Sequence, residues 1–217
     1  MNFFKNLKKV VAVAAATTML VLTGCGKDAG NEGGSKESKP AEKAAGNTIV
    51  ITLNTKEAPL TCENFEKLVK EGFYDGLTFH RVVDDFMAQG GDPLGTGMGG
   101  SDETIKGEFS QNGVENNLSH QRGVVSMARS MDPDSASSQF FICYTDCSFL
   151  DGQYAAFGTV TQGMEIVDDF LKVPRSMGGD GAVSSPDTPI KMKKVEMIDP
   201  DADGSPRVQI TMDDFLK

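Results

Sequence analysis

The sequence TFHRVVDDFMAQGGD occupies residues Thr78 to Asp92 and carries the strongest signal in the chain for both fold and function. It places a single arginine, Arg81, within an otherwise apolar strand pattern, where a cation is rare unless neighbouring groups use its hydrogen bonds. Strand alternation divides the second half into two faces, Phe86, Ala88 and Gly90 on one and Met87, Gln89 and Gly91 on the other. Because neither face has the pattern of a simple core or of a simple solvent-exposed surface, the stretch predicts the wall of a small apolar pocket with a few placed polar groups.

Four further blocks follow downstream in order: GVVSMA at Gly123–Ala128, SSQFFI at Ser137–Ile142, FLDG at Phe149–Gly152 and FG at Phe157–Gly158. Together with the first stretch they resemble the cyclophilin-type peptidyl-prolyl cis-trans isomerases in order and spacing, across residues 48–198. A lone Phe-His-Arg would be weak evidence, whereas five ordered blocks are specific. The resemblance implies a mainly β fold, a closed antiparallel eight-stranded β-barrel capped by two α-helices, and catalysis of rotation about Xaa–Pro peptide bonds.

The resemblance also implies the residues of the site. Arg81 and Gln89 are the expected catalytic residues, with Gln89 fixing either Arg81 or the substrate carbonyl. The expected substrate-binding residues are Phe86, Met87, Ala128, Arg129, Gln139, Phe141, Phe149, Leu150 and Tyr154. Within this set, Phe86, Met87, Phe141 and Leu150 would line the proline pocket, and the backbone at Ala128 and Arg129 would hold the substrate chain.

The chemistry of the reaction explains why an arginine is needed and a cofactor is not. Rotation about an Xaa–Pro bond has a barrier of about 18–20 kcal/mol because the C–N bond has partial double-bond character. In the twisted state the prolyl nitrogen gains a lone pair, and a donor that bonds it only then favours the transition state. Arg81, permanently charged and fork-shaped, suits this role. No group is transferred, so neither cofactor nor metal is expected, and His80 and His120 stand at no metal-ligand spacing.

Residue spacing by itself leaves simpler interpretations open. The three side chains Phe86, Met87 and Phe141 have the spacing of ordinary core residues. Arg81 has Asp84 and Asp85 close in sequence as surface ion-pair partners. The five ordered blocks favour the pocket over both of these interpretations.

Two positions depart from the family pattern. Phe149 stands where a tryptophan is usual, and Tyr154 stands where a histidine is frequent. Both substitutes keep an apolar face, and Tyr154 keeps a hydrogen-bond donor. The resemblance therefore implies that catalysis is retained and that the cyclic peptide inhibitor cyclosporin binds weakly.

Local patterns support a barrel independently of the resemblance. One helix is expected from Pro59 to Gly72, with the apolar stripe Cys62, Phe65, Leu68 and Val69, and a second from Gly163 to Lys172. Other short strands are expected at residues 49–53, 124–128, 139–143 and 190–198, and loops at residues 92–101, 129–138 and 178–189. Many short strands with only two helices favour a closed barrel. The glycine-rich loop after Asp92 lacks the Lys-Ser/Thr of a phosphate-binding loop.

The first 47 residues carry targeting signals. Three lysines precede an apolar run, Val10–Leu22, that is shorter than the roughly 20 residues a membrane-spanning helix needs. Leu-Thr-Gly-Cys at residues 22–25 resembles a bacterial lipobox, which implies a signal peptide over residues 1–24 and lipidation of Cys25. An ordinary secretory signal is the alternative. Residues 25–47 would then be the lipidated cysteine and a flexible tether, residues 48–198 the isomerase domain, and residues 199–217 a C-terminal extension.

Net charge limits the classes of binding partner, and the cysteine count limits the possible disulfides. The net charge of the 217 residues is −10, and it becomes −13 when residues 1–24 and their three lysines are removed. Such a surface disfavours nucleic acid as a partner. Lipidation of Cys25 leaves an odd set of cysteines, of which Cys62 and Cys143 are expected to be small buried side chains. A disulfide between Cys143 and Cys147 is the alternative.

The C-terminal extension contains two signals. Asp-Pro-Asp-Ala-Asp-Gly at residues 199–204 matches the opening of a Ca²⁺ loop, but Ile210 stands at the twelfth position, where glutamate is expected, and an acidic turn is favoured. Val208, Ile210 and Met212 alternate with polar residues, as in a half-buried strand. Family members usually have a strand before the one at residues 49–53, and this chain does not. We therefore predict that residues 207–212 fill that place and close the barrel; a disordered or helical tail is the alternative.

Three functional hypotheses follow. The leading one is a lipid-anchored prolyl isomerase acting on proline-containing polypeptides that fold outside the cytoplasmic membrane. The second is a proline-peptide-binding module or holdase chaperone with little dependence on turnover, which Arg81 disfavours because binding needs only the apolar wall. The third is a transporter's solute-binding lipoprotein, which one barrel-sized domain without a two-lobed pattern disfavours.

Overall fold

The computed structural model describes residues 46–216. The predicted signal peptide, Cys25 and residues 26–45 of the tether lie outside the described residues, so lipidation and targeting stay predictions. None of the helices within the described range combines the length and the apolar character that a bilayer crossing requires.

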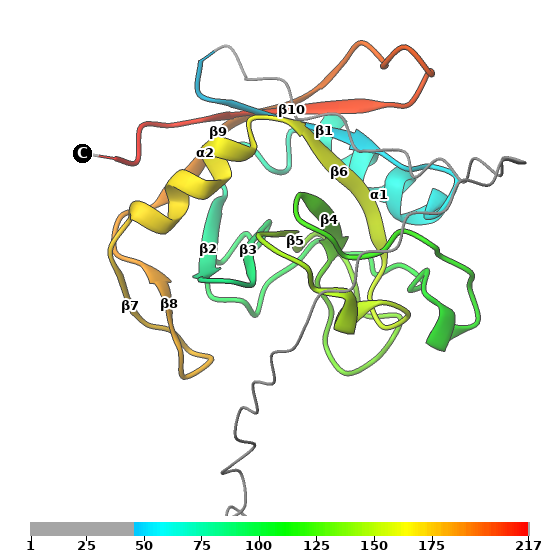
Figure 1. Cartoon of the computed structure of the whole chain (residues 1–217), viewed down its shortest axis with the longest axis horizontal. Helices are drawn as coiled ribbons and strands as arrows, with labels where there is room; N and C mark the ends of the chain where they lie inside the picture. The colour runs from blue at the N-terminus through cyan, green and yellow to red at the C-terminus, as the bar shows by residue number, and fades with distance from the viewer. Residues whose placement is uncertain (1–45, 217) are drawn as a thin grey trace, which may run out of the picture. The chain divides into compact units, whose positions relative to one another are not determined.

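Eight strands of the described chain close into an antiparallel barrel in the order β1-β10-β9-β2-β3-β5-β4-β6 (Figure 1). Their bounds are β1 Thr48–Leu53, β2 Thr78–Val83, β3 Met87–Gly90, β4 Val124–Met127, β5 Phe140–Cys143, β6 Ala156–Gln162, β9 Ile190–Ile198 and β10 Arg207–Met212. Helix α1 (Pro59–Lys70) packs against β9 and β6, and helix α2 (Met164–Asp169) packs against β1. The barrel with two helices confirms the predicted fold class.

Helix α1 forms as its sequence predicts. Pro59 lies in the first turn, where its missing N–H removes no helical hydrogen bond. The stripe from Cys62 to Val69 is buried, and Gly72, with φ +71°, follows the helix end. The Phe65 ring lies 5.0–5.4 Å from the rings of Tyr74, Phe140 and Phe157, so α1 is joined to the aromatic interior of the barrel.

The second helix is shorter than expected. It is α-helical over Met164–Asp169 and tightens into a 3-10 turn over Phe170–Lys172, as helix C-termini often do. Of the apolar residues spaced as a helix stripe in this segment, Ile166, Val167 and Phe170 are buried and Leu171 is partly buried.

Residues 178–189, predicted as a loop, belong in part to a β-hairpin. Strand β7 (Arg175–Met177) pairs antiparallel with β8 (Val183–Pro186) around a Gly-Gly-Asp-Gly-Ala turn, and β8 lies beside β2. The strands are only three and four residues long, and their one buried side chain is the polar Ser184. No apolar alternation therefore marks them in the sequence. For this reason the loop prediction was wrong at residues 183–186, whereas residues 178–182 and 187–189 are outside any strand.

Strand β10 closes the barrel between β9 and β1. It pairs with β1 from Thr48 opposite Thr211 to Thr52 opposite Arg207, and it pairs with β9 along its other edge. Its alternating residues Val208, Ile210 and Met212 are buried. The predicted C-terminal strand is therefore present, and without it β1 and β9 would each lose a hydrogen-bonded neighbour.

The β9–β10 connection is an acidic turn. Its residues 199–206 include Asp201, whose Oδ1 accepts hydrogen bonds from the backbone N–H of Asp203 (3.0 Å) and Ser205 (2.8 Å). The Asp201 carboxylate thus stabilises the turn itself.

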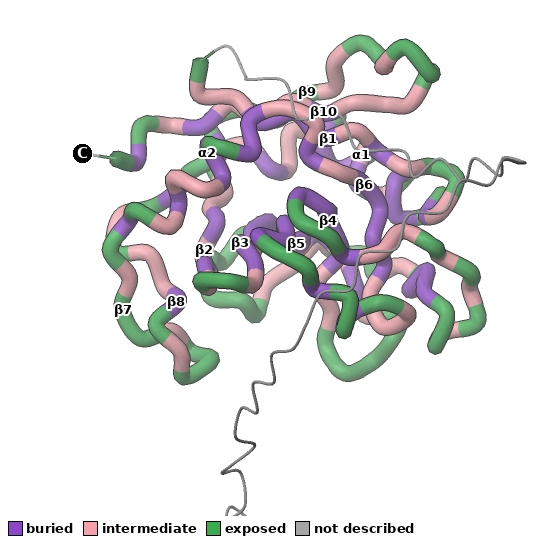
Figure 2. Tube along the Cα trace, viewed as in Figure 1, coloured by how far each residue is buried: buried purple, intermediate pink, exposed green. Residues whose placement is uncertain are grey.

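The interior of the barrel holds the main hydrophobic core. Figure 2 shows buried residues along the barrel strands and exposed residues along the connecting loops and the β7–β8 turn. The six largest fully buried side chains are Tyr74, Phe65, Phe79, Phe140, Phe157 and Phe170. Burial of each such aromatic side chain contributes about 1.5–3 kcal/mol to folding.

Gly91 and Asp92, which follow β3, have structural roles in the backbone of this region. Gly91 has φ +83°, and a Cβ there would lie 2.5 Å from the carbonyl oxygen of Ser138, so only glycine fits. The Asp92 carboxylate accepts hydrogen bonds from the N–H of Leu94 (2.8 Å), Thr96 (2.9 Å) and Gly97 (2.6 Å). Burial by itself would raise the pKa of Asp92, but these backbone donors hold it below its usual value. The loop's N–H groups therefore bind a carboxylate of the chain itself.

Candidate active site

Arg81 and Gln89 face each other across the β2–β3 pair. Nη1 of Arg81 donates to Oε1 of Gln89 (3.3 Å), and Nε2 of Gln89 donates to Oε1 of Gln139 (2.8 Å). Nε2 of Gln139 in turn donates to the carbonyl oxygen of Gly99 at 2.7 Å. This series of amides ends on the glycine-rich loop and turns the oxygen of Gln89 toward the guanidinium.

A small apolar cluster, distinct from the barrel core, lies next to Arg81. Its buried members are Met87, Phe141, Cys143, Cys147 and Leu150, with Val83, Phe86, Ala128 and Tyr154 packed against it. The Met87 Sδ lies 3.8 Å from Nη1 of Arg81, and the guanidinium carbon lies 5.9 Å from the centroid of the Phe86 ring. We call this cluster the pocket wall; it sets a cation beside an apolar surface, as a small-molecule or peptide pocket requires.

Strand β3 contributes to both clusters because its alternate residues face opposite sides. Ala88 belongs to the barrel core, whereas Met87 belongs to the pocket wall. Phe86, expected on the Ala88 face, packs with Met87 instead. It precedes the strand, in a turn where Asp85 has φ +54°, so strand alternation does not extend to it.

A groove extends from the amide series along the substrate-binding residues expected at positions 128, 129 and 139. Its lining includes Gln89, Met98, Ala128, Arg129, Ser135 and Gln139. The N–H of Ala128 already donates to the carbonyl of Gln139 at 2.9 Å. The backbone N–H and C=O of Arg129 make no hydrogen bond to the described part of the chain. Of these two backbones, that of Arg129 is therefore the freer to bind a peptide.

Arg81 also forms an ion pair, with a residue the sequence does not suggest. Its Nε donates to Oδ2 of Asp180, in the β7–β8 turn, at 2.6 Å. Asp84, one of the two expected alternatives, pairs instead with Arg175 at 2.9 Å, and Asp85 occupies the turn before β3. The hydrogen bond from Arg81 lowers the pKa of Asp180 to about 2. Arg81 is thus both a pocket residue and an ion-pair partner.

Comparison with known proteins assigns the chain to one family. The family model for "Cyclophilin type peptidyl-prolyl cis-trans isomerase/CLD" matches residues 41–197. The chain belongs to the cyclophilin-type peptidyl-prolyl cis-trans isomerases. Peptidyl-prolyl cis-trans isomerase B of Bacillus subtilis is 48% identical over 120 residues, covering 55% of this chain and 80% of its own. An isomerase of Helicobacter pylori is 45% identical over 122 residues, covering 55% and 72%.

Solved structures agree with the sequence comparison. A Cryptosporidium parvum cyclophilin, crystallised in the presence of the dipeptide Ala-Pro, superposes with a TM-score of 0.60 at 30% identity. The match covers 68% of this chain and 93% of that one. The chain is therefore an enzyme, a cyclophilin-type peptidyl-prolyl cis-trans isomerase.

The two departures of this cyclophilin from the family pattern both lie at the pocket wall. Phe149 is 63% exposed, and its ring centroid lies 5.8 Å from that of Phe86. The Tyr154 ring meets the Phe141 ring edge-on at 6.0 Å. The side chains predicted for the proline pocket are thus brought together, and Phe149 and Tyr154 lie at its border.

The side chain of Arg129 has a role that the sequence analysis missed. Its guanidinium carbon lies 4.7 Å from the Tyr154 ring centroid and 5.1 Å from that of Phe109. Its Nε and Nη2 both donate to the carbonyl of Gln153, at 3.0 and 2.9 Å. Arg129 therefore fixes Tyr154 through a cation–π contact and through the preceding backbone.

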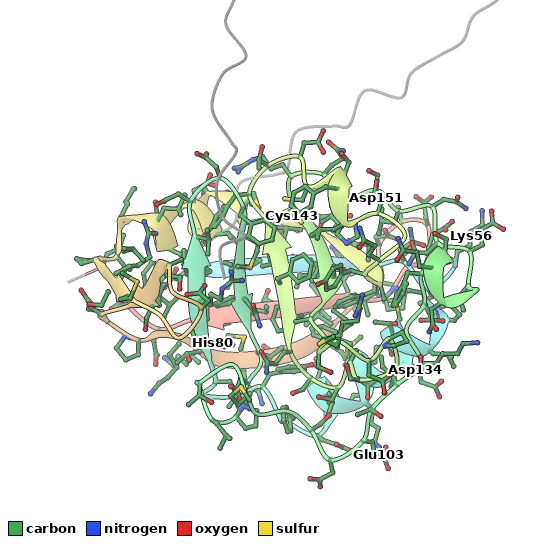
Figure 3. The ribbon with its side chains drawn as sticks, turned by 90° about the horizontal axis from the view of Figure 1, so that it is seen from below. Lys56, His80, Glu103, Asp134, Cys143 and Asp151 are labelled. Atoms are coloured by element: carbon green, nitrogen blue, oxygen red, sulfur yellow. The ribbon has the colours of Figure 1, made fainter. Side chains whose placement is uncertain are left out.

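A buried polar network supports Phe141 from behind. His120 stacks on the Phe141 ring, with centroids 6.1 Å apart and 15° between the planes. Its Nδ1 lies 2.7 Å from Oδ1 of Asp151, and its Nε2 lies 2.9 Å from Oγ of Ser126. Figure 3 shows Asp151 and Cys143 in the upper part of the view, with His80 lower and to the left. Burial lowers the pKa of His120, although Asp151 opposes this shift.

The three cysteines of the described chain are free thiols. Cys62 is buried in the barrel core, and its Sγ donates to the carbonyl of Phe157 at 3.4 Å. Cys143 and Cys147 are buried side by side in the pocket wall, and burial raises the pKa of each. Burial of Cys62 and Cys143 was predicted; the alternative Cys143–Cys147 disulfide is not what the structure contains. Within residues 46–216, no three His, Cys, Asp or Glu side chains are grouped to hold a metal.

The residues that sequence reasoning missed share one property. Asp180, His120 and Ser126 reach the site through the fold, and Asp180 lies 99 residues from its partner Arg81. No local spacing marks such long-range contacts. The Gly-Gly-Asp-Gly sequence around Asp180 is typical of a turn, but it does not indicate that Asp180 pairs with Arg81.

Proposed function

We propose that Arg81 catalyses Xaa–Pro rotation by donating a hydrogen bond to the prolyl nitrogen in the twisted state. In the planar ground states that nitrogen is conjugated and accepts poorly, so the bond forms only as the amide twists. An interaction made only in the transition state raises kcat instead of tightening substrate binding. The pocket wall would hold the proline ring, and the groove at Arg129 would hold the flanking chain.

One observation carries this proposal. The guanidinium of Arg81 borders the pocket wall and is held by Gln89 at 3.3 Å, with Gln89 held in turn by Gln139 at 2.8 Å. A donor fixed before the reaction costs no reorganisation when the amide twists. The relative crystallised with Ala-Pro supports proline-containing polypeptides as the substrate class.

Replacement of Arg81 tests the mechanism. We expect Arg81→Ala to lower kcat/KM for prolyl-peptide exchange, measured by NMR, by about 10²–10³-fold, as the loss of one preorganised donor does elsewhere. The fold should persist because Arg81 is not part of the barrel core. Arg207→Ala is the control, since within residues 46–216 the Arg207 side chain donates to the carbonyl of Asp199 in the β9–β10 turn and to no residue of the site. A well-folded Arg81→Ala enzyme with the wild-type rate would remove Arg81 from the mechanism.

We further propose that the enzyme acts outside the cytoplasmic membrane, anchored by lipid on Cys25. The supporting features are the three lysines, the apolar run and the Leu-Thr-Gly-Cys sequence at the N-terminus. Two acyl chains suffice for stable anchoring where one does not. In cells labelled with palmitate, the full chain should be labelled and pellet with membranes, whereas Cys25→Ser should be unlabelled. An unlabelled wild-type chain in the soluble fraction would contradict this proposal.

A further inference from the structure

We infer that Asp180 is a positioning residue for catalysis, which holds the guanidinium of Arg81 in the orientation that the prolyl nitrogen requires. The inference rests on the role proposed above for Arg81. It assigns a function to the β7–β8 hairpin, whose turn carries Asp180 to the catalytic arginine on β2.

The guanidinium of Arg81 is held at two of its three nitrogens. Nε donates to Oδ2 of Asp180 at 2.6 Å, and Nη1 donates to Oε1 of Gln89 at 3.3 Å. Nη2 makes no hydrogen bond to any residue between 46 and 216. Because the guanidinium is a rigid planar fork, fixing Nε and Nη1 also fixes the direction in which the free N–H groups point.

Asp180 is itself anchored before it binds the arginine. Its Oδ1 accepts hydrogen bonds from the N–H of Ala182 (3.0 Å) and the hydroxyl of Ser184 (2.8 Å). Ser184 is 2% exposed and lies in β8, which runs beside β2. With one oxygen held by the hairpin, the other presents a fixed acceptor to Nε of Arg81.

Asp180 has two effects on Arg81 that oppose each other. Its negative charge offsets part of the positive charge that Arg81 would offer to the prolyl nitrogen, which slows the reaction. Its hydrogen bond restrains a long side chain that is 30% exposed and would otherwise sample several rotamers. A displacement of about 1 Å in a catalytic group can cost ~10²-fold in rate. The charge effect is weakened by the solvent that reaches both side chains, so positioning dominates.

A double-mutant cycle in the full chain tests this inference. Arg81→Ala, Asp180→Ala and the double variant are compared by kcat and KM for prolyl-peptide exchange. We expect Asp180→Ala to lower kcat and kcat/KM together by about 10-fold, part of the cost of a misplaced group, with KM unchanged. In the Arg81→Ala background it should change nothing further, because the group it positions is gone. Asp180→Asn keeps one acceptor and should recover part of the rate.

Asp187→Ala is the matched control. Asp187 directly follows β8 and carries the same charge as Asp180. Its carboxylate accepts a hydrogen bond from Oγ of Ser176 (2.5 Å) and not from Arg81. This variant should keep the wild-type rate. It should also keep the Nε–H signal of Arg81 protected from solvent exchange in NMR spectra, whereas Asp180→Ala should lose that protection.

The outcomes separate this inference from the proposed function. A wild-type rate in Arg81→Ala would remove Arg81 from the mechanism and the positioning role with it. A slow Arg81→Ala beside a wild-type or faster Asp180→Ala would overturn the positioning role alone. Equal losses from Asp180→Ala with and without Arg81, or an equal loss in Asp187→Ala, would show that the hairpin acts on stability and not through Arg81.

Discussion

At the scale of single residues, the site combines a restrained cation with an apolar wall. Arg81 is restrained by Gln89 and Asp180, and the wall beside it contains Met87 and Phe141. The pocket wall binds a ligand through the size and apolarity of its side chains, whereas the guanidinium must be oriented to donate its hydrogen bond. Substitutions in the wall should therefore affect ligand binding, and substitutions around Arg81 should affect kcat.

Phe149 is the residue at which inhibitor binding should differ from the family. The family resemblance implies that the tryptophan usual at this position donates its indole N–H to cyclosporin, and phenylalanine has no such donor. Phe149 is 63% exposed at the border of the pocket wall, so a larger ring fits there without repacking. We expect Phe149→Trp to tighten cyclosporin binding by about 2- to 13-fold, the value of one hydrogen bond. Calorimetry on both proteins measures this, and equal affinities would contradict our interpretation of position 149.

At the scale of elements, β10 contributes more to stability than its place at the chain end suggests. It completes two antiparallel pairs, with β1 and β9, and buries Val208, Ile210, Met212 and, just beyond it, Phe215. Burial of four such side chains is worth about 6–12 kcal/mol, comparable to the about 5–15 kcal/mol that stabilises a whole domain. The C-terminal hairpin is thus part of the barrel and not an appendage.

Removal of β10 should therefore unfold the domain. We expect truncation after Pro200 to give an inactive, unfolded or insoluble product. Ile210→Ala is the graded version, and it should lower the free energy of unfolding by about 2–5 kcal/mol in urea titrations, because the side chain is fully buried. Gln209→Ala, whose side chain does not belong to the core, should change it by about 0.5 kcal/mol or less. A truncated chain with full activity and an unchanged Tm would show that β10 is dispensable.

At the scale of the whole molecule, the free energy of unfolding should fall in two separate pH ranges, one set by two histidines and one by Asp180. Burial lowers the pKa of both His80 and His120, while Asp92 and Asp151 respectively oppose the shift. The unfolded chain therefore binds protons at these histidines before the folded protein does, and stability falls as the pH drops below about 6.5. The pKa of Asp180 is lowered to about 2 by Arg81, so its contribution is present above about pH 4 and is lost below that.

The loss of stability below about pH 6.5 that we attribute to His80 and His120 can be tested directly. We expect the free energy of unfolding of the wild type to be lower at pH 5.5 than at pH 7.5. His120→Asn should reduce this difference although it also weakens the bonds to Asp151 and Ser126, and the His80→Asn, His120→Asn double variant should abolish most of it. Urea titrations at both pH values measure the effect. An undiminished difference in the double variant would assign the pH dependence to other groups.

The sequence by itself determined the family, the barrel and most of the pocket. The short sequence blocks that resemble the family in order and spacing contain Arg81, Gln89, Met87 and Phe141. The apolar alternation of residues 207–212 predicted β10 as a half-buried strand. These features are local, because strand alternation, helix stripes and glycine positions act over a few residues.

Only the tertiary structure decided which charges meet. It paired Arg81 with Asp180 instead of Asp84 or Asp85, and it placed His120 behind Phe141. The strands of the β7–β8 hairpin could not be predicted from the sequence because they are short and carry no apolar alternation. A hydrogen bond requires donor and acceptor within about 3 Å, and across 99 residues only the closed barrel and its hairpin impose that distance.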